Sequence, residues 1–357
     1  MQVAVVSRDP PVRTERTGTR RLGRLASALG DRGHEVVVYC VGWWDEEASG
    51  RRIEFDGLRY EGVTFERSRL FYSRLPGLMA RHRPDVIVAS PTPPATAVAA
   101  AIGGTVARAP VVCDWYGDEP FETGRWLGPA ARLPTRVVAP SELHRTRVRE
   151  LGAGESETVV VPQSIDFSLV ESTPPADRRE VVFASRLDGD ANLESLLLAL
   201  AELRGREDWS ATVIGDGPDR ADYESQADHL SITDRVEFVG DLDREARVAR
   251  YRGAHAFVQT GRRVHFAEEL LWALAAGCVG VVEYQVDSSA HELVERRPRG
   301  IRVTDMEALD DAIEDAWTLP YRDLDEDFRT FDHTAVTERY LELFRDCGVN
   351  VDVDVET

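Results

Sequence analysis

The chain contains no lysine, and all 43 of its basic residues are arginine. Without lysine a protein forms no Schiff base with a carbonyl substrate or with pyridoxal phosphate, and it lacks the lysine of a phosphate-binding P-loop. The formal charge is −20 at pH 7. Acidic surfaces keep proteins soluble at very high salt, so we expect an extreme halophile as the source and no nucleic-acid partner.

Cysteine is scarce, and its four positions are isolated from one another. No pair has the spacing of a metal site or a redox motif, so we expect a reduced, cytosolic protein without a bound metal. The sequence has no apolar run near the roughly 20 residues of a membrane-spanning helix, and we expect no signal peptide. A length of 357 residues predicts two domains with sizeable cores.

Charge is divided unevenly along the chain. Residues 1–173 hold 22 Arg and 22 Asp plus Glu, whereas residues 174–357 hold the other 21 Arg and 41 acids. In the neutral half, the segment Arg67–Arg83 carries arginines interleaved with apolar residues and no acid. This pattern fits a peripheral contact with an anionic membrane surface, but a solvated helix face produces the same pattern. Both interpretations stay open at this point.

Strand and helix patterns alternate along the chain, which predicts parallel sheets with helices on their faces. In the first half, strands are expected at 3–7, 35–40, 85–90, 109–118, 136–141 and 159–166, with a hairpin at 53–66. We place the first domain at 1–173, with a linker from about 171, and the second at 174–334. A terminal helix at 335–348 is expected to cross back to the first domain, followed by an acidic tail at 349–357.

The most informative segment is Val181–Leu203, at the start of the second half. It has the pattern of a buried strand, a short polar loop with Arg186, and an amphipathic helix that starts near Asn192. Ligands of open α/β sheets bind at the carboxyl ends of strands, and helix N-termini favour anions, so Arg186 is a candidate phosphate ligand. Taken alone, the segment is more simply an ordinary strand–helix unit with a surface arginine.

Further patterns follow in a fixed order. They are a strand ending in the turn Gly215-Asp216-Gly217-Pro218, a strand ending at Gly240, the strand Ala254–Thr260, and His265–Tyr284, in which a helix is stopped by Gly277 before a last strand. This order resembles the C-terminal domain of glycosyltransferases of the GT-B fold, and specifically the large retaining family 4. The resemblance extends over nearly the whole chain.

The resemblance implies two Rossmann-like, doubly wound α/β domains that face each other across a cleft. The nucleotide-diphosphate sugar donor would lie on the second domain and a sugar or lipid-linked acceptor on the first, with transfer by retention and without a metal. Arg186 would stabilise the departing diphosphate through paired hydrogen bonds. The other positions expected to contact the donor lie in glycine turns, at strand ends and at helix starts: Gly18, Asn192, Gly215, Gly217, Val239, Gly240, His265 and Phe266.

Three positions depart from the family pattern. Ala191 stands where the family has a lysine, and Val264 and Trp272 stand where it has two glutamates. These losses favour an alternative, in which a catalytically degraded GT-B protein acts as a binding or regulatory partner. A nucleotide-sugar epimerase of the same fold is a further alternative, but the family 4 order of motifs argues against it.

Neighbouring residues can compensate for these losses. Glu268 lies one helical turn before Trp272 and Glu269 is next to it, so we expect either one to supply the catalytic carboxylate. Arg262 or Arg263 can replace the positive charge of the missing lysine.

In the first domain, the strand that ends at Cys113 is followed by a polar and aromatic loop. The family often has a histidine there. In this chain Asp118 or Asp114 is the candidate for contacts with sugar hydroxyls, and Trp115 and Tyr116 are candidates for stacking on a sugar ring, although such loops are as often simple turns.

Overall fold

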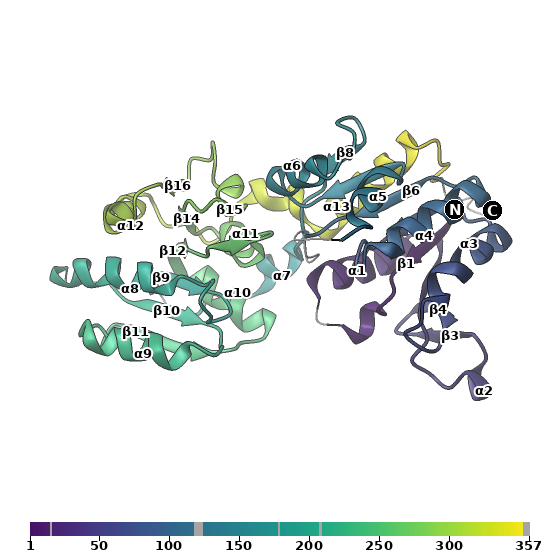
Figure 1. Ribbon diagram of the computed structural model, residues 1–357. Coiled ribbons are helices and arrows are strands. Elements are labelled where there is room, and N and C mark those ends of the chain that lie inside the picture. Colours follow the sequence, from purple (N-terminus) through teal and green to yellow (C-terminus); the bar gives the residue numbers. More distant parts are fainter. Residues whose placement is uncertain (15, 118–123, 178, 207–208, 353–357) are drawn as a thin grey trace. The chain divides into compact units, whose positions relative to one another are not determined.

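The computed structural model describes residues 1–14, 16–117, 124–177, 179–206 and 209–352. By its internal contacts the chain divides into two units (Figure 1): unit 1 is Met1–Gln163 with Thr334–Thr357, and unit 2 is Ser164–His333. The expected boundary between 173 and 174 therefore differs from this division. Helix α7 (Phe167–Ser172) explains the difference, because it packs on α10 (Arg244–Gly253) and α11 (Glu268–Ala275) of unit 2.

Unit 1 alternates strands and helices. Its strands are β1 (Gln2–Val6), β2 (Glu35–Val41), β3 (Arg52–Phe55), β4 (Leu58–Thr64), β5 (Val86–Ala89), β6 (Val111–Asp114), β7 (Arg136–Ala139) and β8 (Thr158–Val160). Its helices are α1 (Thr17–Asp31), α2 (Glu46–Ser49), α3 (Leu70–His82), α4 (Ala95–Ala107), α5 (Leu127–Arg132), α6 (Glu142–Glu150) and α13 (His333–Asp346), the last of which begins at the end of unit 2.

The described strands of unit 1 form one sheet in the order β3-β4-β2-β1-β5-β6-β7-β8. All neighbours are parallel except β3 and β4, which form the expected antiparallel hairpin. The hairpin turns at Asp56 and Gly57, whose φ angles of 50° and 71° match the two left-handed residues that a tight hairpin turn requires.

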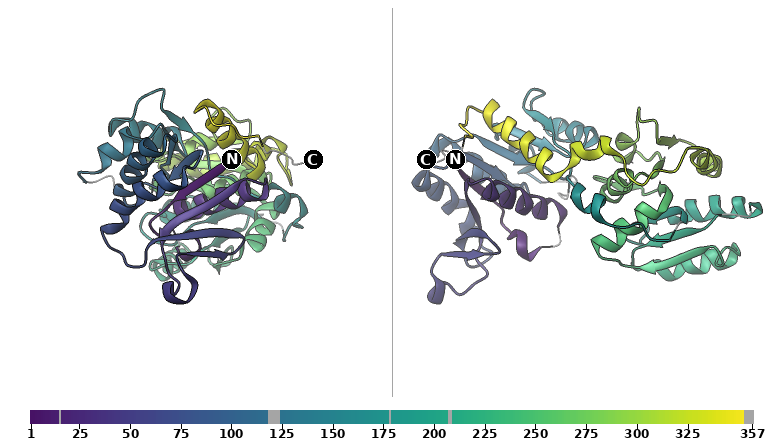
Figure 2. Two further views of the ribbon diagram at one scale, coloured as in Figure 1. Left: turned by 90° about the vertical axis from the view of Figure 1, so that its right-hand side faces the viewer. Right: turned by 180° about the vertical axis from the view of Figure 1, so that it is seen from behind.

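Helices cover both faces of the sheet in unit 1. Leu22 and Leu29 of α1 share one core with Tyr340 and Phe344 of α13, and α3 and α4 pack on the opposite face. Figure 2 shows α13, in yellow, lying along unit 1. The terminal helix thus belongs to the core of the first unit, which agrees with the prediction that it crosses back to the first domain.

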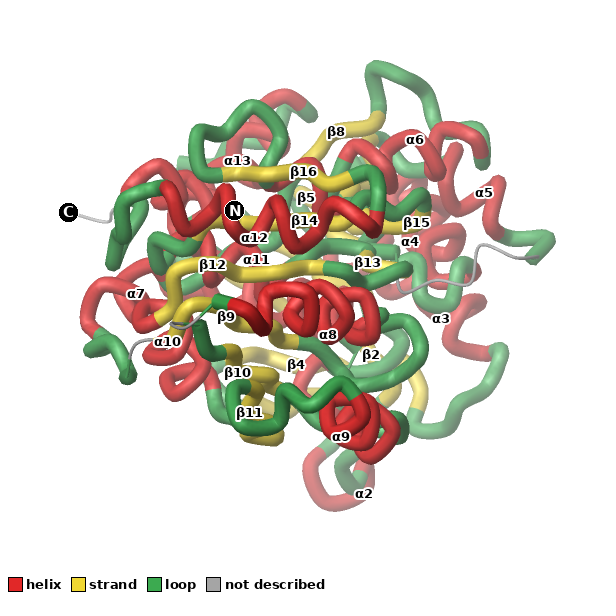
Figure 3. The backbone as a smooth tube through the Cα atoms, turned by 90° about the vertical axis from the view of Figure 1, so that its left-hand side faces the viewer, coloured by secondary structure: helices red, strands yellow, loops and turns green. Residues whose placement is uncertain are grey.

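Unit 2 is a second doubly wound domain. Its main strands are β9 (Arg179–Ala184), β10 (Ala211–Ile214), β11 (Val236–Gly240), β12 (Ala254–Gln259), β14 (Val279–Glu283) and β16 (Gly300–Val303), and a short pair is formed by β13 (Arg263–Val264) and β15 (Asp287–Ser288). Its other helices are α8 (Leu193–Glu202), α9 (Arg220–His229) and α12 (Leu309–Thr318). Figure 3 shows the main strands stacked in the order β11-β10-β9-β12-β14-β16, and all of the neighbours are parallel.

Helices also cover both faces of this second sheet. Helices α8, α9 and α12 contribute to one large apolar core, whereas α10 and α11 pack against each other and against β12. Both predicted Rossmann-like domains are therefore present. In the described parts of the chain, no helix has both the length and the apolar character needed to cross a membrane.

Candidate functional site

The sheet of unit 2 has a topological switch point between β9 and β12. From these neighbouring strands the chain order runs outward in opposite directions, to β10 and β11 on one side and to β14 and β16 on the other. Doubly wound sheets bind ligands at the carboxyl ends of the two strands that flank such a point. Arg186 follows β9, and Arg262 and Arg263 follow β12. The fold therefore brings three arginines to the edge where a ligand is expected.

The two loops at the switch point are tied together by hydrogen bonds. The backbone N–H of Arg262 donates to the carbonyl of Asp190 at 2.8 Å, and the hydroxyl of Thr260 donates to the carbonyl of Ala191 at 3.0 Å. The side-chain amide of Asn192 donates to the carbonyl of Thr260 at 3.1 Å. Ala191 and Asn192 are buried, so they hold the loops in place and do not face solvent.

Each of the three arginines has an acidic neighbour from the same unit. The pairs are Arg186 Nε with Asp188 at 3.2 Å, an Arg262 terminal nitrogen with Glu194 at 2.7 Å, and Arg263 Nε with Asp190 at 4.0 Å. The arginine side chains are 74%, 50% and 69% exposed, respectively. Exposed ion pairs contribute little free energy, so an incoming phosphate can take these guanidinium groups at small cost.

Gly215 and Gly217 let the turn after β10 approach the loop that carries Arg186. A Cβ atom on Gly215 would lie 1.9 Å from the carbonyl oxygen of Ser185, and one on Gly217 would lie 2.2 Å from that of Leu187. Gly215 also has a φ of +128°, which side-chain-bearing residues rarely adopt. Both glycines therefore position the Arg186 loop from behind, and their direct contact with a ligand remains a prediction.

Glu283 is a buried acid at this edge that sequence reasoning missed. It is the last residue of β14 and only 8% exposed. Asn192 donates to its Oε2 at 3.2 Å, and Gln285 donates to its Oε1 at 2.8 Å. Burial raises the pKa of its carboxyl. In the sequence, Glu283 is marked only as a single acid at the end of an otherwise apolar strand. That pattern does not reveal that Asn192 is its partner.

Glu269 and Glu268 lie in the first turn of α11. Both oxygens of Glu269 already accept hydrogen bonds: Arg247 donates to Oε1 at 2.9 Å, and Arg244 at 2.9 Å and Tyr251 donate to Oε2. The Glu268 carboxylate lies 3.5 Å from Arg244 and is 22% exposed. Glu269 therefore anchors α10 to α11, and a catalytic role for either glutamate remains a prediction.

The other expected positions on this edge differ in exposure. Val239 is half-buried near the end of β11, and Gly240 accepts a hydrogen bond from the N–H of Gly215 at 2.9 Å. His265 is exposed, and Phe266 is buried directly before α11. Gly240 thus lies at the carboxyl end of β11, and contacts of these four residues with a donor remain predictions.

Val264 and Trp272, which stand where the family has two glutamates, both have structural roles in unit 2. Val264 lies in β13, which pairs with β15. Trp272 is only 4% exposed, and the Arg244 guanidinium lies over its ring, 4.8 Å from the ring centroid. Among the described residues, no group of three or more His, Cys, Asp or Glu is arranged to hold a metal ion.

Two family models match the chain in sequence. Residues 165–330 match the model of glycosyl transferases group 1, and residues 18–169 match that of glycosyltransferase family 4. Together with the two doubly wound domains, these matches decide the class. The chain is a GT-B glycosyltransferase.

Individual proteins resemble this glycosyltransferase at low identity. A GDP-mannose-dependent alpha-mannosyltransferase of Mycolicibacterium smegmatis is 28% identical over 294 residues, which is 72% of this chain and 73% of that protein. The solved structure of a glycosyltransferase from Rickettsia africae has a TM-score of 0.77 at 14% identity and covers 98% of this chain and 99% of its own. The Anabaena protein HepE in complex with UDP has a TM-score of 0.74 at 18% identity, with 97% and 100% coverage. The two structures support the fold.

In unit 1 of the glycosyltransferase, Asp114 has a structural role. Its Oδ2 accepts hydrogen bonds from Arg21 Nε at 3.0 Å and from the hydroxyl of Tyr340 at 2.8 Å. The guanidinium of Arg21 also donates to the carbonyls of Val161 and Pro162 at 2.7 and 2.9 Å. This buried cluster fastens α13 to α1 and β6. The expected contact of Asp114 with sugar hydroxyls is therefore not supported.

The expected stacking of Trp115 and Tyr116 on a sugar ring is wrong. Trp115 is 0% exposed and belongs to an apolar core of unit 1, and Tyr116 is 4% exposed. Asp118, the other acid proposed for this loop, lies outside the described residues. Gly18 is half-buried in the first turn of α1, and its contact with a donor phosphate remains a prediction.

The basic segment Arg67–Arg83 of the glycosyltransferase is largely α3, and half of its apolar side chains do not face solvent. Phe71, Leu75 and Met79 are 0% exposed in the core under α3, whereas Leu70 is 54% exposed. The expectation of a mixed apolar and basic surface is therefore corrected. The exposed side of α3 carries Arg74 and Arg81 beside Leu70, because the helical period places the core residues on its other side.

Proposed function

We propose that this glycosyltransferase transfers mannose from GDP-mannose to its acceptor with retention of the anomeric configuration. The observation that carries the proposal is the trio Arg186, Arg262 and Arg263 at the switch point of unit 2. The donor assignment is supported by the similarity to the GDP-mannose-dependent relative. The family resemblance of the motifs supports retention.

The chemistry follows from the charge that develops on the leaving group. Breaking the bond between the sugar and the diphosphate leaves negative charge on the phosphate oxygens, so positioned cations lower the barrier. When the donor binds, the Arg186 guanidinium is proposed to exchange its ion pair with Asp188 for paired hydrogen bonds to the diphosphate. Arg262 and Arg263 supply the charge of the missing family lysine, and the N-terminal end of α11 adds a favourable dipole.

A transfer assay tests the donor and the stereochemistry together. Purified protein is incubated with a total lipid extract and either GDP-mannose or UDP-glucose, and the product is isolated for NMR of the new glycosidic bond. We expect mannose to be transferred and the bond to be alpha, as in the donor. Glucose transfer alone would contradict the donor assignment, and a beta bond would contradict retention.

We further propose that the acceptor is lipid-linked and that α3 contacts an anionic membrane surface. Arg69, Arg74 and Arg81 are exposed on α3, and Leu70 is exposed beside them. Each arginine near anionic lipid contributes about 1 kcal/mol at moderate salt, so three can hold the protein at the surface. At molar salt the screening length falls to about 3 Å, and the attraction weakens accordingly.

Co-sedimentation with anionic vesicles tests the membrane contact, at low salt and in molar potassium chloride. The variant Arg69→Gln/Arg74→Gln/Arg81→Gln is expected to pellet much less than wild type at low salt. A matched control replaces three exposed arginines of unit 2, Arg204, Arg296 and Arg322, and should pellet like wild type. The membrane contact would be contradicted if the two triple variants pelleted equally, or if wild type did not pellet at either salt concentration. The exposed side of α3 would then be only a solvated helix face.

A second candidate function is a non-catalytic binding or regulatory partner of an active transferase. Ala191, Val264 and Trp272 favour it, because none of these side chains can replace the charge of the family residues. This candidate predicts no turnover with any nucleotide sugar. The transfer assay therefore separates the two functions.

A further inference from the structure

A cavity of about 500 Å³ lies in unit 1, and strands β1 to β4 and helix α3 contribute to its lining. Gln2, Glu35 and Pro84, which line it, stand at or just before the amino-terminal ends of β1, β2 and β5. Ligands of doubly wound sheets bind at the opposite, carboxyl ends of the strands. The cavity is therefore separate from the carboxyl edge of this sheet, and it lies entirely within unit 1.

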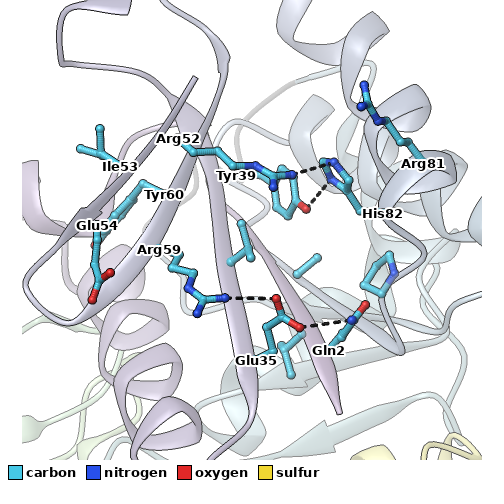
Figure 4. A pocket seen from close by; sticks show the side chains of 14 residues that line it. Gln2, Glu35, Tyr39, Arg52, Ile53, Glu54, Arg59, Tyr60, Arg81 and His82 are labelled. Atoms are coloured by element: carbon cyan, nitrogen blue, oxygen red, sulfur yellow. Dashed lines mark hydrogen bonds and ion pairs between the residues drawn. The ribbon is translucent and has the colours of Figure 1, made fainter. Parts of the chain in front are cut away.

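Two hydrogen-bonded groups stand on opposite sides of the cavity (Figure 4). On one side, Glu35 accepts from Arg59 at 3.1 Å and from the side-chain amide of Gln2 at 3.2 Å. On the other side, His82 bonds through Nδ1 to the hydroxyl of Tyr39 at 2.7 Å and through Nε2 to Arg52 at 2.8 Å. The side chains are thus held in place before any ligand arrives, and they offer both donors and acceptors.

The protonation of His82 follows from its partners. A guanidinium only donates, so Nε2 of His82 accepts from Arg52 and the ring proton is on Nδ1. Burial lowers the pKa of His82, and the charges of Arg52 and Arg81 lower it further against the opposing effect of Glu61. The imidazole is neutral at pH 7 and donates to the oxygen of Tyr39. The Tyr39 hydroxyl accepts this bond at the wall of the cavity, where the residue is 3% exposed.

A second cavity of about 600 Å³ borders the first, and Val36 and Leu58 in its lining belong to the core on the other face of the sheet. The two share Glu35, Glu54 and Arg59 as lining residues. Asp31 and Asp56 also line the second cavity. Carboxylates thus predominate there, whereas the first cavity has the three arginines Arg52, Arg59 and Arg81.

The charges along the two cavities define the class of ligand. The carboxylates repel anions such as a nucleoside diphosphate or a phospholipid headgroup, and the arginines repel cations. A neutral molecule with many hydroxyl groups meets neither penalty. Its hydroxyls can donate to Glu35, Glu54 and Asp56 and accept from Arg59 and Arg81, and the volumes lie in the range of small-ligand sites.

We propose that the two adjoining cavities form an accessory site for a neutral oligosaccharide. The site would hold the glycan part of an acceptor or product. This proposal rests on the proposed function, because it takes the acceptor or product to be a glycan. It is a binding site and not a second catalytic centre.

Ligand-observed NMR with α-linked mannotriose tests the proposal on the full chain. The titration is run with GDP present at saturation, so that binding at the donor edge does not contribute. Wild type is expected to bind mannotriose. Glu35→Gln and Tyr39→Phe are each expected to weaken binding about tenfold, because each removes a hydrogen-bonding group from the cavity. Glu150→Gln, an exposed acid on α6, is the matched control and should bind like wild type.

Arg186→Ala separates this proposal from the proposed function. It should weaken GDP binding in unit 2 and leave mannotriose binding unchanged. Mannotriose binding that is absent in wild type, or that is equal in wild type, Glu35→Gln and Tyr39→Phe, would overturn the accessory site. Since Glu35 is half-exposed, Glu35→Gln is expected to fold, and a thermal unfolding curve like that of wild type checks this.

Discussion

Replacing Arg186 by alanine is expected to weaken GDP binding without unfolding the protein. The Arg186 side chain is 74% exposed and its partner Asp188 lies 3.2 Å away, so the ion pair that is lost contributes at most about 1 kcal/mol to folding. Hydrogen bonds to charged groups contribute about 1.5–3 kcal/mol. Arg186 gives up its ion pair with Asp188 when it binds phosphate, so its net contribution to the free energy of GDP binding is about 2 kcal/mol. Loss of this contribution corresponds to roughly 30-fold weaker binding in Arg186→Ala.

The assay is isothermal titration of wild type and variants with GDP. Arg186→Gln, which keeps much of the shape but not the charge, should lose nearly as much affinity as Arg186→Ala. Asp188→Asn removes the competing carboxylate and should tighten binding a few-fold. Arg204→Ala, an exposed arginine after α8, is the control and should bind like wild type. Equal affinity of Arg186→Ala and wild type would refute the assignment of Arg186 to the diphosphate.

Three further outcomes follow from buried or paired groups. Glu269→Gln is expected to lower the free energy of unfolding by about 2 kcal/mol in urea titrations, since it disrupts the bonds from Arg244 and Arg247, whereas Glu268→Gln is expected to lower turnover with little loss of stability. Full turnover in both variants would remove both carboxylates from catalysis. Burial raises the pKa of Glu283 in the folded protein, so the folded state binds its proton more tightly than the unfolded chain, and its contribution to stability falls as pH rises from about 4.5 through that raised pKa. Urea unfolding between about pH 4 and pH 8 should show this decline in wild type and not in Glu283→Gln. Tyr340→Phe should cost about 1–2 kcal/mol, because Asp114 loses a buried donor, and an unchanged midpoint of thermal unfolding would argue against the Arg21 cluster as a fastening for α13.

The elements of both units were predictable because their signals are local. Short apolar strands bounded by glycines, and helices with one apolar side, have recognisable periods in the sequence. The turn at Asp56 and Gly57 and the glycine-rich turn after β10 carry their own backbone signals. The motif order then placed Arg186 at the carboxyl end of the right strand.

The side-chain partners were not predictable, because they are distant in sequence. Asp114 lies 93 residues from Arg21 and 226 from Tyr340, and Glu283 lies 91 residues from Asn192. No local pattern marks such pairs, and an acid in a polar loop has the same sequence signal whether it is buried or exposed. The same reason explains Trp115, which was expected at a ligand and lies in the core.

The expected domain boundary differs from the division by contacts for a related reason. A stretch rich in Ser, Pro and acidic residues after Glu171 has the composition of a linker. In the structure, however, Arg329 donates to Glu171, and Arg252 donates to the backbone of Thr173. These contacts join the segment to unit 2, and only the folded chain reveals them.

The central claim is that the arginine edge of unit 2 binds the diphosphate of a nucleotide-sugar donor. Titration of the wild-type protein with GDP, UDP and ADP tests it most directly. One molecule of GDP is expected to bind per chain, more tightly than UDP or ADP, and Arg186→Ala is expected to bind GDP roughly 30-fold more weakly. Binding of none of the three nucleotides would contradict the account and favour the non-catalytic partner.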